Sequence, residues 1–105
     1  MQFQFNTDNH IEGDDRLAEK AESTVTGALG HLTGRITRVE VHLADLNGAK
    51  GGSDDIKCTI EARPEGMQPH TVTHKDADTD ASLRGAGKKL RTLLESEFGK
   101  LDKRR

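Results

Sequence analysis

Lysines and arginines in the last quarter of the chain are the residues best suited to contact a partner. Placed on a helical wheel, Arg84, Lys88 and Arg91 fall within about 60° of one another beside an apolar stripe. Lys89 lies on the other flank of this stripe, and Lys100 follows further along. A row of positive charges on a helix matches a phosphate backbone, where each neutralised phosphate releases counterions. The sequence therefore predicts that Arg84, Lys88, Lys89, Arg91 and Lys100 contact the phosphate backbone of a nucleic acid.

The distribution of charge along the chain favours this hypothesis. Residues 1–79 carry eight Lys/Arg and fourteen Asp/Glu, a net −6, whereas residues 80–105 carry eight and four, a net +4. Only the basic end suits a polyanion. The alternative is that this basic helix is an ordinary solvent-exposed surface whose positive charge is balanced by the acidic residues in the rest of the chain. Glu95 interrupts the row of basic residues, and the sequence predicts no exposed aromatic residue to stack on a base.

The histidines, the cysteine and the serines do not predict catalysis or metal binding. His70 and His74 are four residues apart on an expected strand, roughly 13 Å, which is too far to share one metal ion. His42 and Cys58 are expected on opposite sides of the sheet. No serine stands in a nucleophile motif. We therefore expect no enzymatic activity, no metal, no cofactor and no small-molecule substrate.

Residues 85–89, Gly-Ala-Gly-Lys-Lys, resemble a phosphate-binding loop only superficially. The Walker pattern requires glycine where Ser82 stands and serine or threonine where Lys89 stands. The segment also lies within a helical stripe instead of between a strand and a helix. We reject a nucleoside triphosphate site here.

Two segments with alternating apolar and polar residues, 38–43 and 56–62, predict a hairpin that buries one face. Cys58, the only cysteine, falls on the inward side, where a thiol behaves as a small hydrophobe. Residues 45–54, rich in Asp, Asn, Gly and Ser, predict a long exposed loop between them. One face of the sheet therefore needs a covering layer.

Two further strands and two helices complete the pattern. Residues 1–5 and 70–75 alternate in the same way, and residues 64–69, with two prolines, predict a turn. Asp14 and the acidic segment 76–80 are placed to cap helices. The inward positions of the outer strands are Met1, Phe3, Phe5, His70, Val72 and His74. The apolar stripes are Leu17, Ala21, Val25, Ala28, Leu29 and Leu32 in one helix and Leu83, Ala86, Leu90, Leu93, Leu94, Phe98 and Leu101 in the other.

The order β-α-β-β-β-α predicts an α+β fold. We expect a two-layer sandwich with a four-stranded mixed sheet, the first two strands parallel and both helices on one face. With 105 residues, 31% apolar and 32% charged, the chain suits a single domain over residues 1–105 with a thin core. No apolar stretch reaches 18 residues and no leader pattern is present, so we expect no membrane contact and a cytoplasmic location.

This order, read with residues 36–41, 60–63 and 78–94, resembles the ribosome hibernation promoting factor family, also called RaiA-like or sigma-54 modulation proteins. The last helix of that family begins Asp-x-Tyr-x-Ala-Ile-Asp and continues to Asp-Lys-Leu-x-x-Gln-Leu. This sequence matches the pattern at Asp78, Leu83, Lys89, Leu90 and Leu94.

The sequence departs from that pattern at several positions. Asp80 replaces the tyrosine, and Arg84 and Lys88 stand where acids are usual. The resemblance therefore implies an RNA contact only at Lys89, and the other basic residues are predicted from the helical wheel.

The resemblance implies a fold like that of double-stranded RNA-binding domains. It also implies a protein that binds the small ribosomal subunit, in the channel for messenger and transfer RNA, and silences translation in stressed cells. We therefore expect a short, single-domain form, a non-enzymatic monomer that binds small-subunit ribosomal RNA. The alternative, favoured by the acidic body and the motif departures, is a protein-interaction or stress-regulatory module without ribosome binding.

Overall fold

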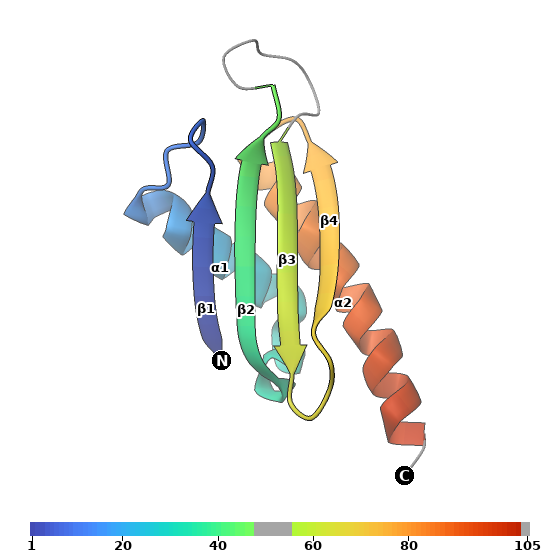
Figure 1. Cartoon of the computed structure of the whole chain (residues 1–105). Helices are drawn as coiled ribbons and strands as arrows, with labels where there is room; N and C mark the ends of the chain where they lie inside the picture. The colour runs from blue at the N-terminus through green and yellow to red at the C-terminus, as the bar shows by residue number, and fades with distance from the viewer. Residues whose placement is uncertain (48–55, 104–105) are drawn as a thin grey trace.

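The computed structural model describes residues 1–47 and 56–103. It contains four strands, two α-helices and one short 3-10 helix, in the predicted order (Figure 1). The elements are β1 (Gln2–Thr7), α1 (Asp15–Leu29), η1 (Gly30–Arg35), β2 (Ile36–Asp45), β3 (Ile56–Pro64), β4 (His70–Asp76) and α2 (Thr79–Lys103). Most of the loop predicted at residues 45–54 lies outside the described residues.

The four strands form one sheet in the order β1-β2-β3-β4. β1 runs parallel to β2, whereas β2 with β3 and β3 with β4 are antiparallel. Both helices cover the same face of the sheet, behind the strands in Figure 1. These observations confirm the predicted α+β sandwich with a mixed four-stranded sheet.

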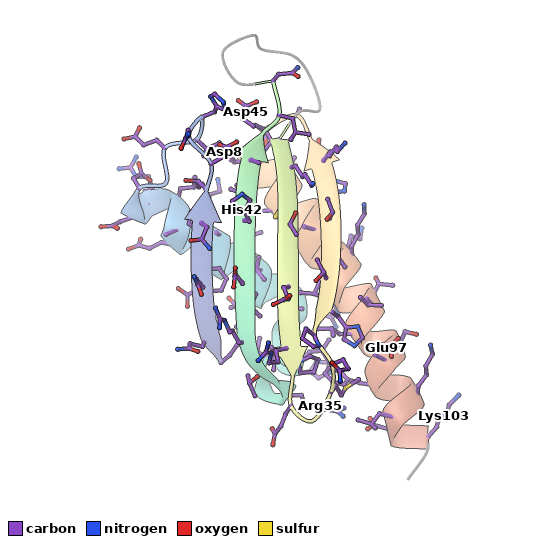
Figure 2. All side chains as sticks on the ribbon, in the orientation of Figure 1. Asp8, Arg35, His42, Asp45, Glu97 and Lys103 are labelled. Atoms are coloured by element: carbon purple, nitrogen blue, oxygen red, sulfur yellow. The ribbon has the colours of Figure 1, made fainter. Side chains whose placement is uncertain are left out.

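Alternation along the central strands creates the core. Successive side chains of a strand point to opposite faces, so every second residue of β2 and β3 is turned toward the helices. Val39, Val41, Leu43, Cys58, Ile60 and Ala62 are all fully buried there, as predicted. Burial raises the pKa of the Cys58 thiol to about 12, which keeps it protonated. His42 is exposed on the open face (Figure 2).

Asp14 and Asp78 begin the two helices as predicted. The first N–H groups of a helix have no partner within it, and a carboxylate at the cap can accept from them. The carboxylate of Asp14 accepts a hydrogen bond from the N–H of Leu17 (2.9 Å), and that of Asp78 from the N–H of Ala81 (2.7 Å).

Side-chain contacts join α2 to the rest of the fold at both of its ends. The hydroxyl of fully buried Ser82 donates to the carbonyl of Ile56 in β3 (2.7 Å). Near the C-terminal end, Arg35 of η1 donates two hydrogen bonds of 3.2 Å to Asp102 and lies 4.0 Å from the centre of the Phe98 ring. Contacts therefore hold both ends of this 25-residue helix and not only its central turns.

The first strand differs from its prediction. β1 extends to Thr7 instead of ending at Phe5, because its pairing with β2 continues to Leu43. Met1 is 47% exposed instead of inward, because the pairing with β2 begins only at Gln2. The length of the partner strand, and not the local pattern, sets these limits.

Other boundaries also shift. Pro64 belongs to β3, opposite Ile36, and not to the predicted turn, and Asp45 belongs to β2. Leu93 and Leu101 of the predicted stripe are only partly buried. The C-terminal end of α2 extends beyond the end of the sheet (Figure 1), so fewer neighbours cover Leu101. Leu93 lies at the edge of the apolar stripe, whereas Leu94 next to it is fully buried.

We predict that Leu90→Ala lowers the free energy of unfolding by about 2–5 kcal/mol, because it leaves a cavity in place of a fully buried side chain. The same substitution at Leu46, which is 51% exposed, is expected to change stability by less than about 0.5 kcal/mol. Urea unfolding followed by far-UV circular dichroism measures both. Equal effects at the two positions would contradict the placement of α2 against the sheet.

Candidate nucleic-acid interface

The five predicted contact residues all lie on α2, on the flanks that the core leaves uncovered. Arg84, Lys88, Lys89 and Lys100 are exposed, and Arg91 is partly buried. Leu83, Leu90 and Leu94 on the same helix are fully buried against the sheet, which fixes the rotation of the helix. The predicted residues therefore lie on both exposed flanks of the helix, with Arg91 toward α1 and Lys89 toward β4.

Three of these five cations pair with carboxylates of their own helix. Arg84 Nε lies 3.2 Å from Asp80, Arg91 Nε lies 3.5 Å from Glu95, and Lys100 Nζ lies 3.6 Å from Glu97. Exposed ion pairs of this kind contribute about 0–1 kcal/mol, so they do not block a stronger anion. They do cancel much of the local positive charge that the sequence indicated.

Arg91 also has a structural contact that the sequence did not indicate. Its guanidinium donates to the carbonyl of Ala28 in the last turn of α1 (3.1 Å). The final carbonyls of a helix have no partner within the helix, so this bond satisfies one of them. Gly30 follows with φ of 56°, a conformation suited to glycine. Arg91 therefore joins the two helices.

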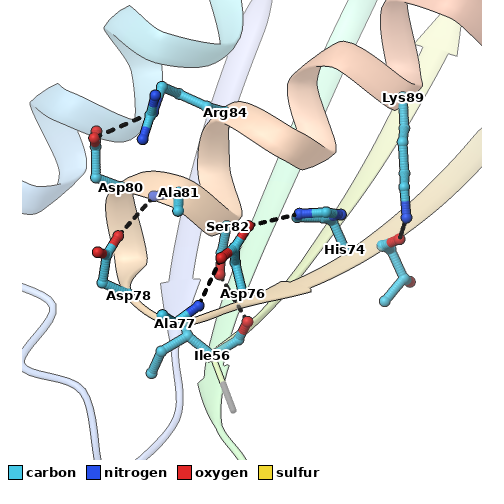
Figure 3. Close-up of polar contacts among 11 residues, drawn as sticks. Ile56, His74, Asp76, Ala77, Asp78, Asp80, Ala81, Ser82, Arg84 and Lys89 are labelled. Carbon is cyan, nitrogen blue, oxygen red and sulfur yellow. Dashed lines mark hydrogen bonds and ion pairs between the residues drawn. The ribbon is translucent and has the colours of Figure 1, made fainter. Parts of the chain in front are cut away.

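Lys88 and Lys89 differ from the other three cations. The ammonium group of Lys88 forms no hydrogen bond or ion pair with any described residue, and Lys89 Nζ donates only to the carbonyl of Thr73 in edge strand β4 (3.1 Å; Figure 3). Neither ammonium is neutralised by a carboxylate within residues 1–47 and 56–103. Of the five predicted contact residues, these two lysines are therefore best able to receive an external phosphate.

A hollow of about 680 Å³ lies beside these lysines, between α2 and β4. Its lining is largely apolar in character, and none of its residues is acidic. The lining residues are His74, Gly85, Lys88, Lys89, Thr92, Leu93 and Ser96. The sequence analysis had identified only the two lysines as contacts.

His74 has a defined position at this hollow. Its Nε2 lies 3.0 Å from the carboxylate of Asp76 (Figure 3), and its ring edge lies so close to α2 that a Cβ at Gly85 would come within 2.2 Å of it. The N–H of Ala77 and then His74 itself lower the pKa of Asp76, so this carboxylate stays charged. The inward position of His74 and a glycine inside the facing helix were the signals available in the sequence.

The exposed surface of α1 is acidic and differs in this respect from α2. Asp15, Glu19 and Glu22 surround a smaller hollow of about 350 Å³ floored by Phe3 and Phe5. Between the helices, Asp80 accepts from both Lys20 (3.3 Å) and Arg84 (3.2 Å). Asp80 and the carboxylates of α1 therefore interrupt the positive charge of α2 on the side that faces α1.

Residues 1–47 and 56–103 contain neither a metal-binding cluster nor a membrane-spanning helix. No group of three or more His, Cys, Asp or Glu side chains there could hold a metal ion. No helix in that part of the chain is long and apolar enough to cross a membrane.

The fold and the exposed lysines of α2 define a small α+β domain suited to contact a polyanion. The sequence matches the family model described as sigma 54 modulation protein / S30EA ribosomal protein over residues 6–102, so the chain belongs to this family. This confirms the resemblance inferred from the sequence and places the protein among ribosome-associated factors.

Two solved structures resemble the chain over nearly its whole length. The N-terminal domain of Protein Y from Thermus thermophilus has a TM-score of 0.70 and 19% identity, with 91% of this chain and 98% of that chain covered. A ribosomal subunit interface protein from Coxiella burnetii has a TM-score of 0.70 and 14% identity, with 94% and 99% covered. At these identities the likeness establishes the fold. No curated protein sequence matches the chain significantly.

We predict that Arg91→Gln lowers the free energy of unfolding by about 1–2 kcal/mol, because it removes a charged donor from the carbonyl of Ala28. Lys88→Gln, which removes a cation without a described partner, is expected to change stability by less than about 0.5 kcal/mol. Chemical denaturation of the two variants gives both values. If Lys88→Gln destabilises the protein as much as Arg91→Gln, the assignment of Arg91 as an anchor is wrong.

Proposed function

We propose that this protein binds ribosomal RNA of the small ribosomal subunit through the β4 side of α2, and that it inhibits translation or stabilises idle ribosomes under stress. Membership of the sigma 54 modulation protein / S30EA ribosomal protein family is the observation that carries this proposal. The similarity to a ribosomal subunit interface protein agrees with it. The protein acts as a cytoplasmic monomer, without catalysis and without a cofactor.

The charges on α2 support this mode of binding. Lys88 and Lys89 reach solvent without a carboxylate partner among the described residues, on a helix whose rotation is fixed by the core. Phosphate contacts position a protein on RNA, and the shape of the RNA supplies most of the specificity. Arg84, Lys100 and Arg91 are secondary contacts in this proposal, because a carboxylate beside each of them offsets its positive charge.

A second candidate is a protein-interaction or stress-regulatory module that does not bind ribosomes. The acidic surface of α1 and the ion pairs along α2 favour this alternative. The two candidates differ in whether the intact protein associates with small subunits at low salt.

Co-sedimentation of the purified protein with small ribosomal subunits tests the proposal. We expect binding at low salt that weakens as salt is raised, because released counterions contribute to affinity. The double variant Lys88→Glu/Lys89→Glu is expected to lose binding. Neutral replacements at the same positions are expected to reduce the salt slope by about one per lysine.

Lys57→Glu/Lys75→Glu is the matched control. These two lysines are paired across β3 and β4 on the open face of the sheet, and their replacement changes the net charge equally. The control is expected to sediment like the wild type. Failure of the wild-type protein to sediment at low salt would favour the second candidate, and equal losses in both double variants would reject a specific role for α2.

A further inference from the structure

We propose that the hollow between α2 and β4 binds one unstacked nucleotide of single-stranded RNA, with the base against the His74 ring and Gly85 and the phosphate between Lys88 and Lys89. This inference rests on the proposed function and deepens it, because it names the form of RNA that the surface recognises. The hollow of about 680 Å³ falls in the range of sites that hold small ligands, about 300–1,000 Å³.

The floor of the hollow suits a nucleobase. Leu93 is only partly buried, and Gly85 lines the hollow next to the His74 ring that packs against it. The hydroxyl of Thr92 donates to the carbonyl of Lys88 (3.1 Å), which leaves the methyl group to line the site. Apolar surface beside a planar ring is what an extruded base requires, because water solvates the faces of a base poorly.

His74 supplies the planar ring. Its side chain is 25% exposed, and the bond of Nε2 to Asp76 holds the ring in the hollow (Figure 3). The close approach of Gly85 fixes the ring from the side of α2. A ring that is already immobilised loses little entropy when a base stacks on it, so the site is organised before binding.

The rim of the hollow suits a phosphate. Lys88 and Lys89 are its charged lining residues apart from the histidine, and no acidic residue lines it. The bond from Lys89 to the Thr73 carbonyl is exposed, so a phosphate oxygen can replace it with a stronger charge-assisted bond. Ser96 adds a hydroxyl at the other end of the hollow, within reach of base edges or a ribose hydroxyl.

A regular RNA duplex could not fill the hollow with a base. Bases of a double helix stay within their stack and present phosphates and 2′-hydroxyl groups outward. A duplex could engage the two lysines but could not place a base in the hollow. The geometry therefore favours loops, bulges and single-stranded segments over regular helices.

The experiment compares oligoadenylate with an RNA duplex of the same length, by fluorescence anisotropy, for wild type and His74→Ala. Removing one stacking ring is expected to weaken oligoadenylate binding by about 5- to 100-fold and to leave duplex binding unchanged. His42→Ala is the matched control, because His42 is exposed on the opposite face of the sheet. Binding to oligoadenylate should also shift the amide signals of Gly85 and Leu93 in the NMR spectrum of the wild type.

A second pair of variants keeps the test decisive if His74→Ala disturbs folding. Ser96→Glu places a carboxylate in the hollow from an exposed helical position, whereas Ser23→Glu makes the same change on the exposed surface of α1. Only Ser96→Glu is expected to lose oligoadenylate binding. The proposal is overturned if His74→Ala and Ser96→Glu bind like their controls, if the NMR shifts lie elsewhere, or if wild type does not bind the oligonucleotide.

Sedimentation with small subunits separates this inference from the proposed function. The nucleotide site alone is rejected if the wild type sediments with subunits but the variants at the hollow bind oligoadenylate as well as the wild type does. Wild-type protein that binds oligoadenylate through the hollow but never sediments would retain the nucleotide site and reject ribosome binding.

Discussion

One-sided burial of the sheet is the constraint on which the rest of the structure depends. Apolar side chains leave β2 and β3 toward a single face, and both helices are needed to cover it. α2 therefore has to turn Leu83, Leu90 and Leu94 inward. Once these residues are fixed, the rotation of the helix is fixed too, and its cations can lie only on the exposed flanks. The location of the candidate interface is thus a consequence of core packing.

Two glycines of α2 set the distances to its neighbours. At Gly87 a Cβ would lie 3.0 Å from the Cβ of Ala28, and at Gly85 it would collide with the ring of His74. Each glycine weakens the helix by about 1 kcal/mol relative to alanine. Because these two positions lack a side chain, α1 packs closely against one side of α2 and β4 approaches the other side. The hollow beside Lys88 and Lys89 exists because the edge strand and the helix meet at a residue without a side chain.

The sequence predicted the fold well because its signals are local. Alternation in residues 38–43 and 56–62, the caps at Asp14 and Asp78, and the two stripes each depend on residues near one another in the chain. Strand limits were less predictable, since β1 continues only as far as its partner allows. The sequence predicted that the candidate site consists of cations on the last helix, but it did not predict their contacts or the hollow beside them. The bond from Arg91 to Ala28 joins residues 63 positions apart, and the hollow is lined by residues of both β4 and α2, so neither feature has a sequence pattern.

The charges around α2 and α1 affect which cations contact RNA first in the proposed complex and how the domain is oriented toward it. Each of Arg84, Arg91 and Lys100 has a carboxylate beside it that a polyanion would repel. Lys88 and Lys89 have no such neighbour among the described residues, so in the proposed complex the first contacts are with these two. The acidic surface of α1 adds a second effect, because Asp15, Glu19 and Glu22 are repelled by RNA over roughly a Debye length, about 8 Å at physiological salt. In the proposed complex, attraction on the β4 side of α2 and repulsion along α1 together turn one side of the domain toward RNA. The acidic body, which by its net charge alone argues against a nucleic-acid partner, therefore restricts the orientations in which the basic side can dock.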